Sequence, residues 1–232
     1  MKTLKTFILL LAVTLTIPSI CACGDDDDNS PIVGPGGNSG KNNDKHEYVD
    51  LGLPNGTLWA TCNVGASKPE EYGDWFAWGE TIPKDIDAWY PEWNNYKYYN
   101  ETGLYKYNSS DRRMELEPID DAATVNWGEN WQTPSPAQFY DLINGAYTTR
   151  EWKTLNGVIG VKITSKSNGN SIFLPTSHKY WTRSLDSGSR YQATYFYFFS
   201  ENENEGVAFN RNHSPRCEPC LVRPVRKNNE EK

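Results

Sequence analysis

Turn-forming residues divide the chain into short pieces between His46 and Arg226. Pro54-Asn55-Gly56 and Asn168-Gly169 are two of these turns, and the apolar runs on either side of each are typical of antiparallel hairpins. The composition excludes a collagen-like chain, a coiled coil and a polytopic membrane protein. The strands that we expect lie at residues 48–51, 58–62, 158–164, 171–174, 180–182, 194–199 and 221–225.

Two of these expected strands have sequences that specify their position in a sheet. Residues 194–199 are aromatic on both faces, so we expect a central strand that is covered on both sides. Pro224 has no N–H to donate to a neighbouring strand, and it therefore places residues 221–225 at a sheet edge or at a strand end.

Two helices are expected before the later strands. Residues 120–127 begin with acidic side chains and are followed by a glycine. Ser135 and Gln138 have the spacing of a capping box, Pro136 fits the first helical position, and Gly145 is expected to end this second helix. The face of the second helix that should reach the core carries Phe139, Leu142 and Ile143.

Length and composition fit a single packed domain. The chain has 232 residues, of which 37% are apolar and 13% aromatic, and aromatic rings bury a large area each. A net charge of −7 argues against a nucleic-acid-binding protein, which needs a basic surface. We therefore expect an α+β fold with two helices and a mostly antiparallel sheet in residues 46–226, and a disordered tail at residues 227–232.

The N-terminus has the features of a lipoprotein signal. Two lysines precede an apolar run at residues 7–17, which is too short to span a membrane with room to spare. Cys23 follows the small residue Ala22, as a bacterial lipoprotein signal peptidase requires, whereas Cys21 follows a bulky residue. We expect residues 1–22 to be removed as a signal peptide and Cys23 to carry the lipid. An ordinary secretory signal cleaved nearby is the alternative.

An acidic run and a polar linker follow Cys23. Adjacent carboxylates such as Asp25–Asp28 stay solvated, and the Pro/Gly/Asn/Ser-rich stretch after them has little to bury, so residues 23–45 are expected to be a flexible tether. The order Cys-Gly followed by aspartates resembles the acidic lipoprotein export signal of Bacteroidota. The resemblance implies an outer-membrane lipoprotein that is exposed on the cell surface.

Several motifs of the domain resemble one family in their order along the chain. They are Tyr48–Ala66, Glu71–Glu80, Asp120–Ala123, Asn126–Gly128, Ser167–Pro175, Tyr180-Trp181 and Val222–Arg226. This series is similar to the Fibrobacter succinogenes major paralogous domain, which is abundant in Bacteroidota surface lipoproteins. The resemblance implies a C-type-lectin-like fold, in which the terminal strands meet and an irregular loop region binds ligands. The chain departs from the family at Gln132 and in a short loop at residues 176–179.

Three cysteines, Cys62, Cys217 and Cys220, lie outside the signal region. An exported protein can form disulfides, and relatives in this family often carry a cysteine at the position of Cys217, so the resemblance implies a Cys62–Cys217 disulfide. Pairing of Cys62 with Cys220 is the alternative. If residues 217–220 are extended, their two cysteines lie about 10 Å apart, too far for a bridge. A redox pair would need its first cysteine at a helix N-terminus that follows a strand, and a strand is expected directly after Cys220 instead. A zinc site completed by His213 would need a second, paired set of ligands beside this histidine, which the sequence lacks.

The strongest functional feature is an aromatic-rich segment. Its rings are Trp89, Tyr90, Trp93, Tyr96, Tyr98, Tyr99, Tyr105 and Tyr107. Asparagine, lysine and glutamate side chains lie between them, and such a mixture suits stacking on sugars or recognition of a protein. The residues that we expect to face a ligand are Trp89, Tyr90, Trp93, Tyr96 and Tyr99. The alternative is that these rings pack the segment onto the sheet.

No catalytic constellation is readable in the sequence. The three histidines have no serine or cysteine at a triad spacing, and Asp120-Asp121 fits a helix start. A lectin-type calcium site would need a carboxylate that Trp93-Asn94-Asn95 lacks. We expect a surface-anchored, non-enzymatic binding module for a glycan or protein ligand, with no cofactor and no metal. An enzyme of the formylglycine-generating or redox class and a structural surface-coat component are the alternatives.

Overall fold

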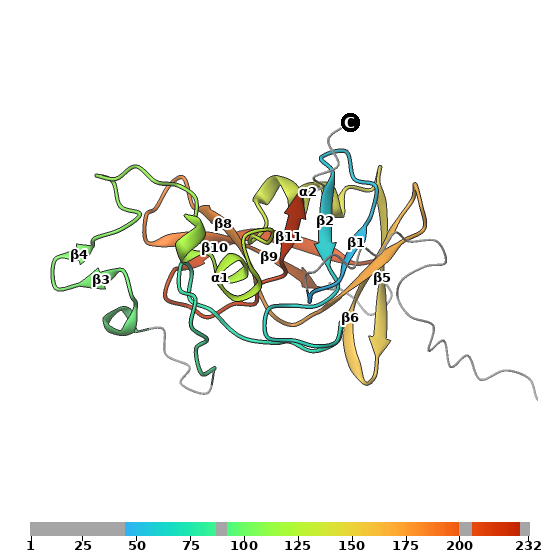
Figure 1. The fold of residues 1–232 in the computed structure, drawn as a ribbon, viewed down its shortest axis with the longest axis horizontal. Coiled ribbons are helices and arrows are strands. Elements are labelled where there is room, and N and C mark those ends of the chain that lie inside the picture. Colours follow the sequence, from blue (N-terminus) through green and yellow to red (C-terminus); the bar gives the residue numbers. More distant parts are fainter. Residues whose placement is uncertain (1–44, 87–91, 200–205, 228–232) are drawn as a thin grey trace, which may run out of the picture. The chain divides into compact units, whose positions relative to one another are not determined.

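The computed structural model describes residues 45–86, 92–199 and 206–227, all of which belong to one compact unit, Pro31–Lys232. The regular structure in these residues consists mainly of short antiparallel strands with two α-helices (Figure 1). The expected α+β class with a mostly antiparallel sheet is therefore confirmed. Within the same residues, no helix is long and apolar enough to cross a membrane.

The two ends of the domain meet in one sheet. β1 (Tyr48–Asp50), β2 (Thr57–Ala60) and β11 (Val225–Lys227) pair antiparallel in the order β1-β2-β11. The turn between β1 and β2 needs a glycine, because Gly56 has a φ of 66° and donates its N–H to Leu53 O at 2.9 Å. The predicted hairpin is present, and β11 extends one residue beyond the predicted end of the domain.

The segment before β11 is held by an arginine side chain. A strand was predicted from residue 221, but β11 begins only at Val225. The buried Arg223 guanidinium donates to Asn63 Oδ1 (2.8 Å), Ala60 O (3.0 Å), Thr61 O (2.8 Å) and Phe173 O (3.0 Å). Burial lowers the pKa of this guanidinium. Arg223 thus joins the C-terminal segment both to the end of β2 and to a strand of the next sheet.

Two further three-stranded antiparallel sheets follow along the chain. The first, in the order β5-β6-β7, consists of β5 (Thr148–Leu155), β6 (Val158–Ser165) and β7 (Ser171–Pro175). The second, in the order β10-β9-β8, consists of β8 (Tyr180–Leu185), β9 (Gln192–Phe199) and β10 (Ala208–Pro215). The sequence did not predict β5 and β10, nor the short ladder of β3 (Tyr99–Asn100) with β4 (Gly103–Leu104).

β9 is the central strand of its sheet, as predicted, but its two faces are not equally covered. The buried face carries Thr194, Phe196 and Phe198, and the other face carries the half-buried Tyr195, Tyr197 and Phe199. On this second face Tyr195 packs against buried residues, but Tyr197 and Phe199 belong to no buried cluster, so the expectation that the strand is covered on both sides is wrong for these two residues.

The second predicted helix, α2 (Pro136–Ile143), has the expected start. Ser135 Oγ accepts the N–H of Gln138 at 3.2 Å, and Gln138 Oε1 accepts the N–H of Ser135 at 2.8 Å, which completes the capping box. The helix ends at Ile143, two residues before the predicted glycine. Phe139, Leu142 and Ile143 are buried, as the apolar spacing predicts.

The first predicted helix, α1 (Ala122–Trp127), begins two residues later than predicted. Asp121 is its N-cap and accepts the N–H groups of Ala123 and Thr124. Pro118–Asp120 form a separate 3₁₀ turn, η2, and a similar turn, η1, lies at Trp93–Asn95. The two adjacent aspartates therefore have different roles, and only Asp121 caps the helix.

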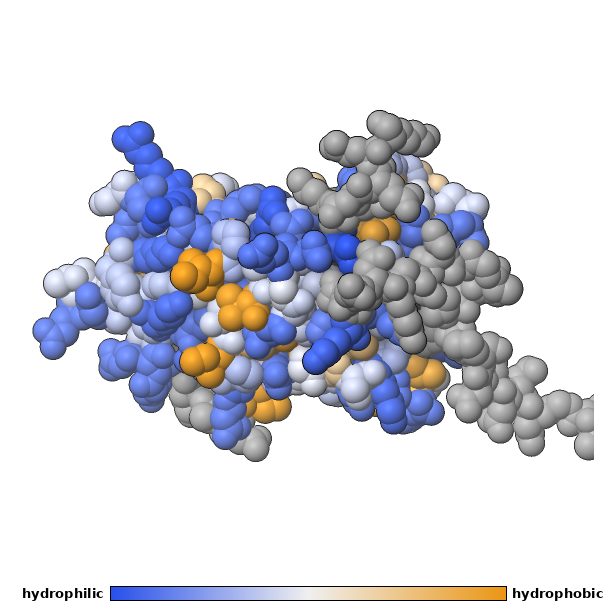
Figure 2. Space-filling view, viewed as in Figure 1, coloured by the Kyte–Doolittle hydropathy of each residue, from blue (hydrophilic) through white to orange (hydrophobic). Residues whose placement is uncertain are grey.

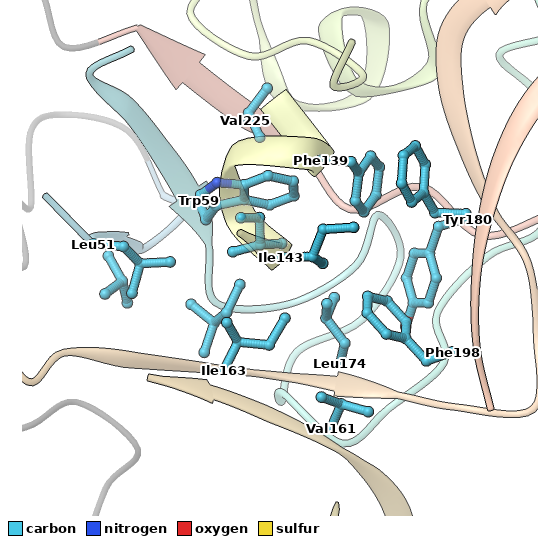
Figure 3. Close-up of a cluster of buried hydrophobic side chains, with 14 of the residues drawn as sticks. Leu51, Trp59, Phe139, Ile143, Val161, Ile163, Leu174, Tyr180, Phe198 and Val225 are labelled. Carbon is cyan, nitrogen blue, oxygen red and sulfur yellow. The ribbon is translucent and has the colours of Figure 1, made fainter. Parts of the chain in front are cut away.

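Buried hydrophobic side chains form two cores. The first lies between α2 and the strands, where Trp59 of β2 is edge-on to Phe139 at 5.2 Å and Phe139 stacks on Phe196 of β9 at 4.6 Å. Figure 3 shows side chains of β2 and α2 facing those of β6 and β7 in this core. The second core includes Phe76, Trp78, Tyr96, Tyr98, Tyr107, Trp181, Cys217 and Cys220. Part of the aromatic-rich segment therefore belongs to the interior.

Candidate functional site

Three tyrosines of the aromatic-rich segment are buried in the second core. Tyr96, Tyr98 and Tyr107 have only 3%, 3% and 0% of their surface exposed. Because a buried ring cannot stack on a ligand, the prediction that Tyr96 faces a ligand is wrong. Packing onto the interior, the alternative considered for this segment, holds for these three rings.

A buried arginine explains why these rings turn inward. The Arg216 guanidinium is fully buried, and its central carbon lies 5.0 Å from the ring centroid of Trp78 and 5.1 Å from that of Tyr96. Arg216 Nε donates to Tyr96 Oη at 2.8 Å, and Tyr96 Oη donates to Trp78 O at 2.6 Å. The remaining guanidinium donors reach the carbonyl oxygens of Tyr107, Arg190 and Lys106. One cation thus binds the aromatic-rich segment to two other parts of the chain.

A buried carboxylate binds the same segment from the other side. Asp120 accepts hydrogen bonds from the hydroxyls of Tyr98 and Tyr107, and from the ammonium groups of Lys97 and Lys106. Burial raises the pKa of the Asp120 carboxyl, but hydrogen bonds from Lys106, Tyr98, Tyr107 and Lys97 outweigh it and hold the pKa at about 2. Asp120 is therefore ionised at neutral pH, and all four of its side-chain donors are basic or phenolic.

Two of the predicted ligand residues remain near the surface. Trp93 and Tyr99 are half-buried, whereas Trp89 and Tyr90 lie outside the described residues. The Trp93 ring lies 5.4 Å from the rings of both Tyr99 and Tyr191, measured between centroids, and it is nearly perpendicular to Tyr191. Tyr191 is 49% exposed. We call Trp93, Tyr99 and Tyr191 the surface aromatic cluster.

The surface aromatic cluster is fixed by the groups beneath it. Trp93 is edge-on to the buried Tyr96 at 5.6 Å, and Tyr96 is held by Arg216. The backbone N–H of Arg216 also donates to Tyr191 O at 3.0 Å, so one residue positions both sides of the cluster. The sequence did not indicate Tyr191 as a ligand residue, because it lies outside the aromatic-rich segment and the residues next to it in the sequence are not aromatic.

Polar side chains surround the surface aromatic cluster. Glu92, Asn94, Asn95 and Asn100 are exposed, and Asn95 Nδ2 donates to Glu92 Oε2 at 3.2 Å. Partly exposed rings beside amide and carboxylate groups can bind a polyhydroxylated ligand through stacking and directional hydrogen bonds.

All three described cysteines are free thiols, so the structure contains no Cys62–Cys217 disulfide. The chain is also not extended at Cys217 as the distance argument assumed, because this residue lies in a turn that Glu218 N closes by donating to Pro215 O at 2.9 Å. Burial raises the pKa of Cys217 to about 11 and raises that of Cys220 as well. Both thiols are therefore protonated at neutral pH, a poor state for a redox nucleophile.

His213, which was considered as a zinc ligand, lies beside an aspartate. His213 Nε2 lies 3.5 Å from Asp186 Oδ1. In residues 45–86, 92–199 and 206–227, no group of three or more His, Cys, Asp or Glu side chains could hold a metal ion.

Gln132 and the short loop at residues 176–179 both make contacts with other parts of the domain. Gln132 Oε1 accepts a hydrogen bond from Arg183 Nη1 at 2.8 Å. In the short loop, His178 is edge-on to Tyr72 at 4.8 Å and to Trp75 at 4.6 Å, and burial lowers its pKa.

Aliphatic side chains form a separate exposed feature near α1. Figure 2 shows several hydrophobic side chains on the face of the domain where α1 lies. Val125 is exposed on α1, and Ile119 is exposed on the 3₁₀ turn that precedes it. Asn126 Nδ2 donates to Thr81 O at 3.1 Å, which brings the exposed Ile82 close to this helix. An aliphatic surface of this kind is typical of protein contact rather than of sugar binding.

Comparisons of the chain with protein-family models, with curated proteins and with solved structures find no match.

Proposed function

We propose that this protein is a lipid-anchored outer-membrane protein, exposed on the cell surface, whose C-type-lectin-like domain binds a glycan and has no enzymatic activity. The observation that carries the glycan proposal is the surface aromatic cluster, with Trp93 in contact with both Tyr99 and Tyr191. The pairing of β1 and β11 with β2 supports the proposed fold, since it joins the two ends of the domain.

The positions of the rings favour binding because they are set before a ligand arrives. Arg216 and Asp120 hold the segment beneath the cluster through buried charges, so little side-chain freedom is lost on binding. The protonated thiols of Cys217 and Cys220 argue against the redox alternative.

A glycan array probed with the full chain tests the proposal. Trp93→Ala and Tyr191→Ala should each weaken a detected interaction by about tenfold, because each removes a stacking ring. Tyr140→Ala is the control, since Tyr140 is an exposed ring on α2 and not a member of the cluster. Wild-type affinity in both cluster variants, with their folding intact, would exclude this surface as the binding site.

The anchor can be tested separately from the ligand. Metabolic labelling with a radioactive fatty acid should label the wild type and Cys21→Ser, but not Cys23→Ser. Protease treatment of intact cells should degrade the domain if it is exposed on the surface. Label retained in Cys23→Ser, or a protected domain, would contradict the proposed anchor or location.

A protein partner, including a second copy of the chain, is the second candidate, because aliphatic side chains are exposed at α1. Sedimentation velocity of the full chain, compared with Ile119→Asp, measures self-association. Concentration-dependent dimerisation that Ile119→Asp abolishes would favour a structural surface-coat role. A monomer in both chains would leave the glycan proposal as the stronger one.

A further inference from the structure

The second face of β9 is a row of aromatic rings. Side chains alternate between the faces of a strand, so Tyr195, Tyr197 and Phe199 point to the face opposite α2. Successive rings on this face are two residues apart, which is about 6.7 Å along the strand. The strand therefore places its three rings in a line.

The neighbouring strand adds amide groups to the same face. In the β9–β10 register, Asn212 lies opposite Tyr195 and Asn210 lies opposite Tyr197. Directly paired residues share a face, and both asparagines are exposed. We call Tyr195, Tyr197, Phe199, Asn210 and Asn212 the β9–β10 face.

The interior does not account for the outer two rings of this face. Tyr195 packs against the second core, but Tyr197 and Phe199 belong to neither core and lie nearly parallel to each other, 6.0 Å apart between centroids. Among the residues that the structure describes, neither the Tyr197 hydroxyl nor the Asn210 amide has a hydrogen-bond partner. The buried Tyr96, Tyr98 and Tyr107 differ, because each of their hydroxyls is hydrogen-bonded.

The charge of the β9–β10 face restricts its ligand. None of its five side chains carries a charge. The Lys179 ammonium group lies 4.9 Å from the Tyr195 centroid and is paired with Glu218. A face with rings, amides and no net charge is complementary to an uncharged, hydroxyl-rich chain, and not to an acidic polysaccharide or a basic peptide.

The geometry points to a second binding site: the β9–β10 face binds an extended neutral polysaccharide, with sugar rings stacked on Tyr197 and Phe199 and hydroxyls bound by Asn210. It uses no residue of the surface aromatic cluster. The two sites can therefore fail separately, since Trp93→Ala tests one and substitutions on β9 and β10 test the other.

Native affinity electrophoresis of the full chain, in gels that contain a soluble neutral glucan, mannan or xylan, tests this site. At least one of these polymers should retard the wild type. Tyr197→Ala should then weaken the interaction by about fivefold or more, and Asn210→Ala by about threefold. The control is Arg211→Ala, because Arg211 is the next residue on β10 and pairs with Phe196 on the opposite face. Its affinity should equal that of the wild type.

Three outcomes would overturn the site. They are no retardation of the wild type by any of the neutral polymers, retardation only by an acidic polymer such as polygalacturonate, and unchanged affinity in both Tyr197→Ala and Asn210→Ala. If Tyr197→Ala does not fold, Asn210→Ala decides, since its side chain is exposed. Loss of affinity in Trp93→Ala alone is a case of the third outcome, and it would assign binding to the surface aromatic cluster.

Discussion

Replacement of Asp120 by asparagine tests whether one buried charge holds the aromatic-rich segment in place. The Asp120 carboxylate joins this segment to the turn before α1 through two tyrosines and two lysines. Asp120→Asn keeps the size of the side chain but removes the charge that all four donors share. Lys106 also forms an ion pair with Glu117 at 2.7 Å, and we expect this contact to remain in the variant.

The pKa of Asp120 sets the size of the expected effect. The folded protein holds it at about 2, against an ordinary value of 3.8, and one pKa unit corresponds to about 1.4 kcal/mol. Ionised Asp120 therefore stabilises the fold by about 2 kcal/mol, and screening is limited because the side chain is only 4% exposed. Since its folded pKa is depressed, this stabilisation is present above about pH 4 and is lost as the pH falls toward 2.

Urea unfolding of the wild type and Asp120→Asn measures this difference. At neutral pH the variant should be less stable by about 2 kcal/mol, with a melting temperature about 4–8 °C lower. Between about pH 4 and pH 2 the two stabilities should converge. Glu101→Gln is the matched control, because it removes an exposed carboxylate from the same segment. Equal stability of Asp120→Asn and wild type at neutral pH, or a gap that persists in acid, would refute the reasoning.

Three further results are expected. Arg216→Lys should lower the free energy of unfolding, measured with urea, by about 3–5 kcal/mol, because an ammonium group cannot replace the buried guanidinium donors. A loss of less than about 1 kcal/mol would contradict this expectation. Ser135→Ala should cost about 1 kcal/mol in the same assay, since it removes the helix cap, and an unchanged midpoint would argue against the capping box. In a chain whose signal-region cysteines are replaced by serine, a thiol reagent should modify Cys62 before unfolding, and Cys217 and Cys220 only afterwards. A single reactive thiol in the unfolded chain would instead reveal a disulfide.

The parts of the fold that the sequence predicts are those that local interactions determine. The capping box at Ser135 satisfies helix N–H groups within four residues, so α2 could be placed before the structure was known. β5 and β10 could not, because they are edge strands with polar sequences whose backbone partners lie on β6 and β9. Such strands are specified by the neighbour that they pair with and not by their own apolar pattern.

The candidate site was only partly predictable for a related reason. The sequence indicated aromatic density around Trp93, but the residue that turns Tyr96 inward, Arg216, lies 120 residues further along the chain. Tyr191 joins Trp93 from that same distant part of the chain. A short sequence window contains the rings and not the partners that decide which of them face solvent.

Whether a tyrosine hydroxyl has a hydrogen-bond acceptor inside the protein therefore distinguishes a packed ring from a ligand-binding ring better than the local density of rings does. A buried phenol must have its hydrogen bond satisfied inside the protein, and Tyr96, Tyr98 and Tyr107 each donate to an internal oxygen. Burial raises the pKa of all three hydroxyls, as expected for groups removed from solvent. Tyr197 sits beside exposed asparagines without such an acceptor in the described part of the chain, so its hydroxyl remains available to a ligand. This criterion assigns the rings at the centre of the aromatic-rich segment, where the ring density is highest, to packing, and it favours the proposed binding site on β9.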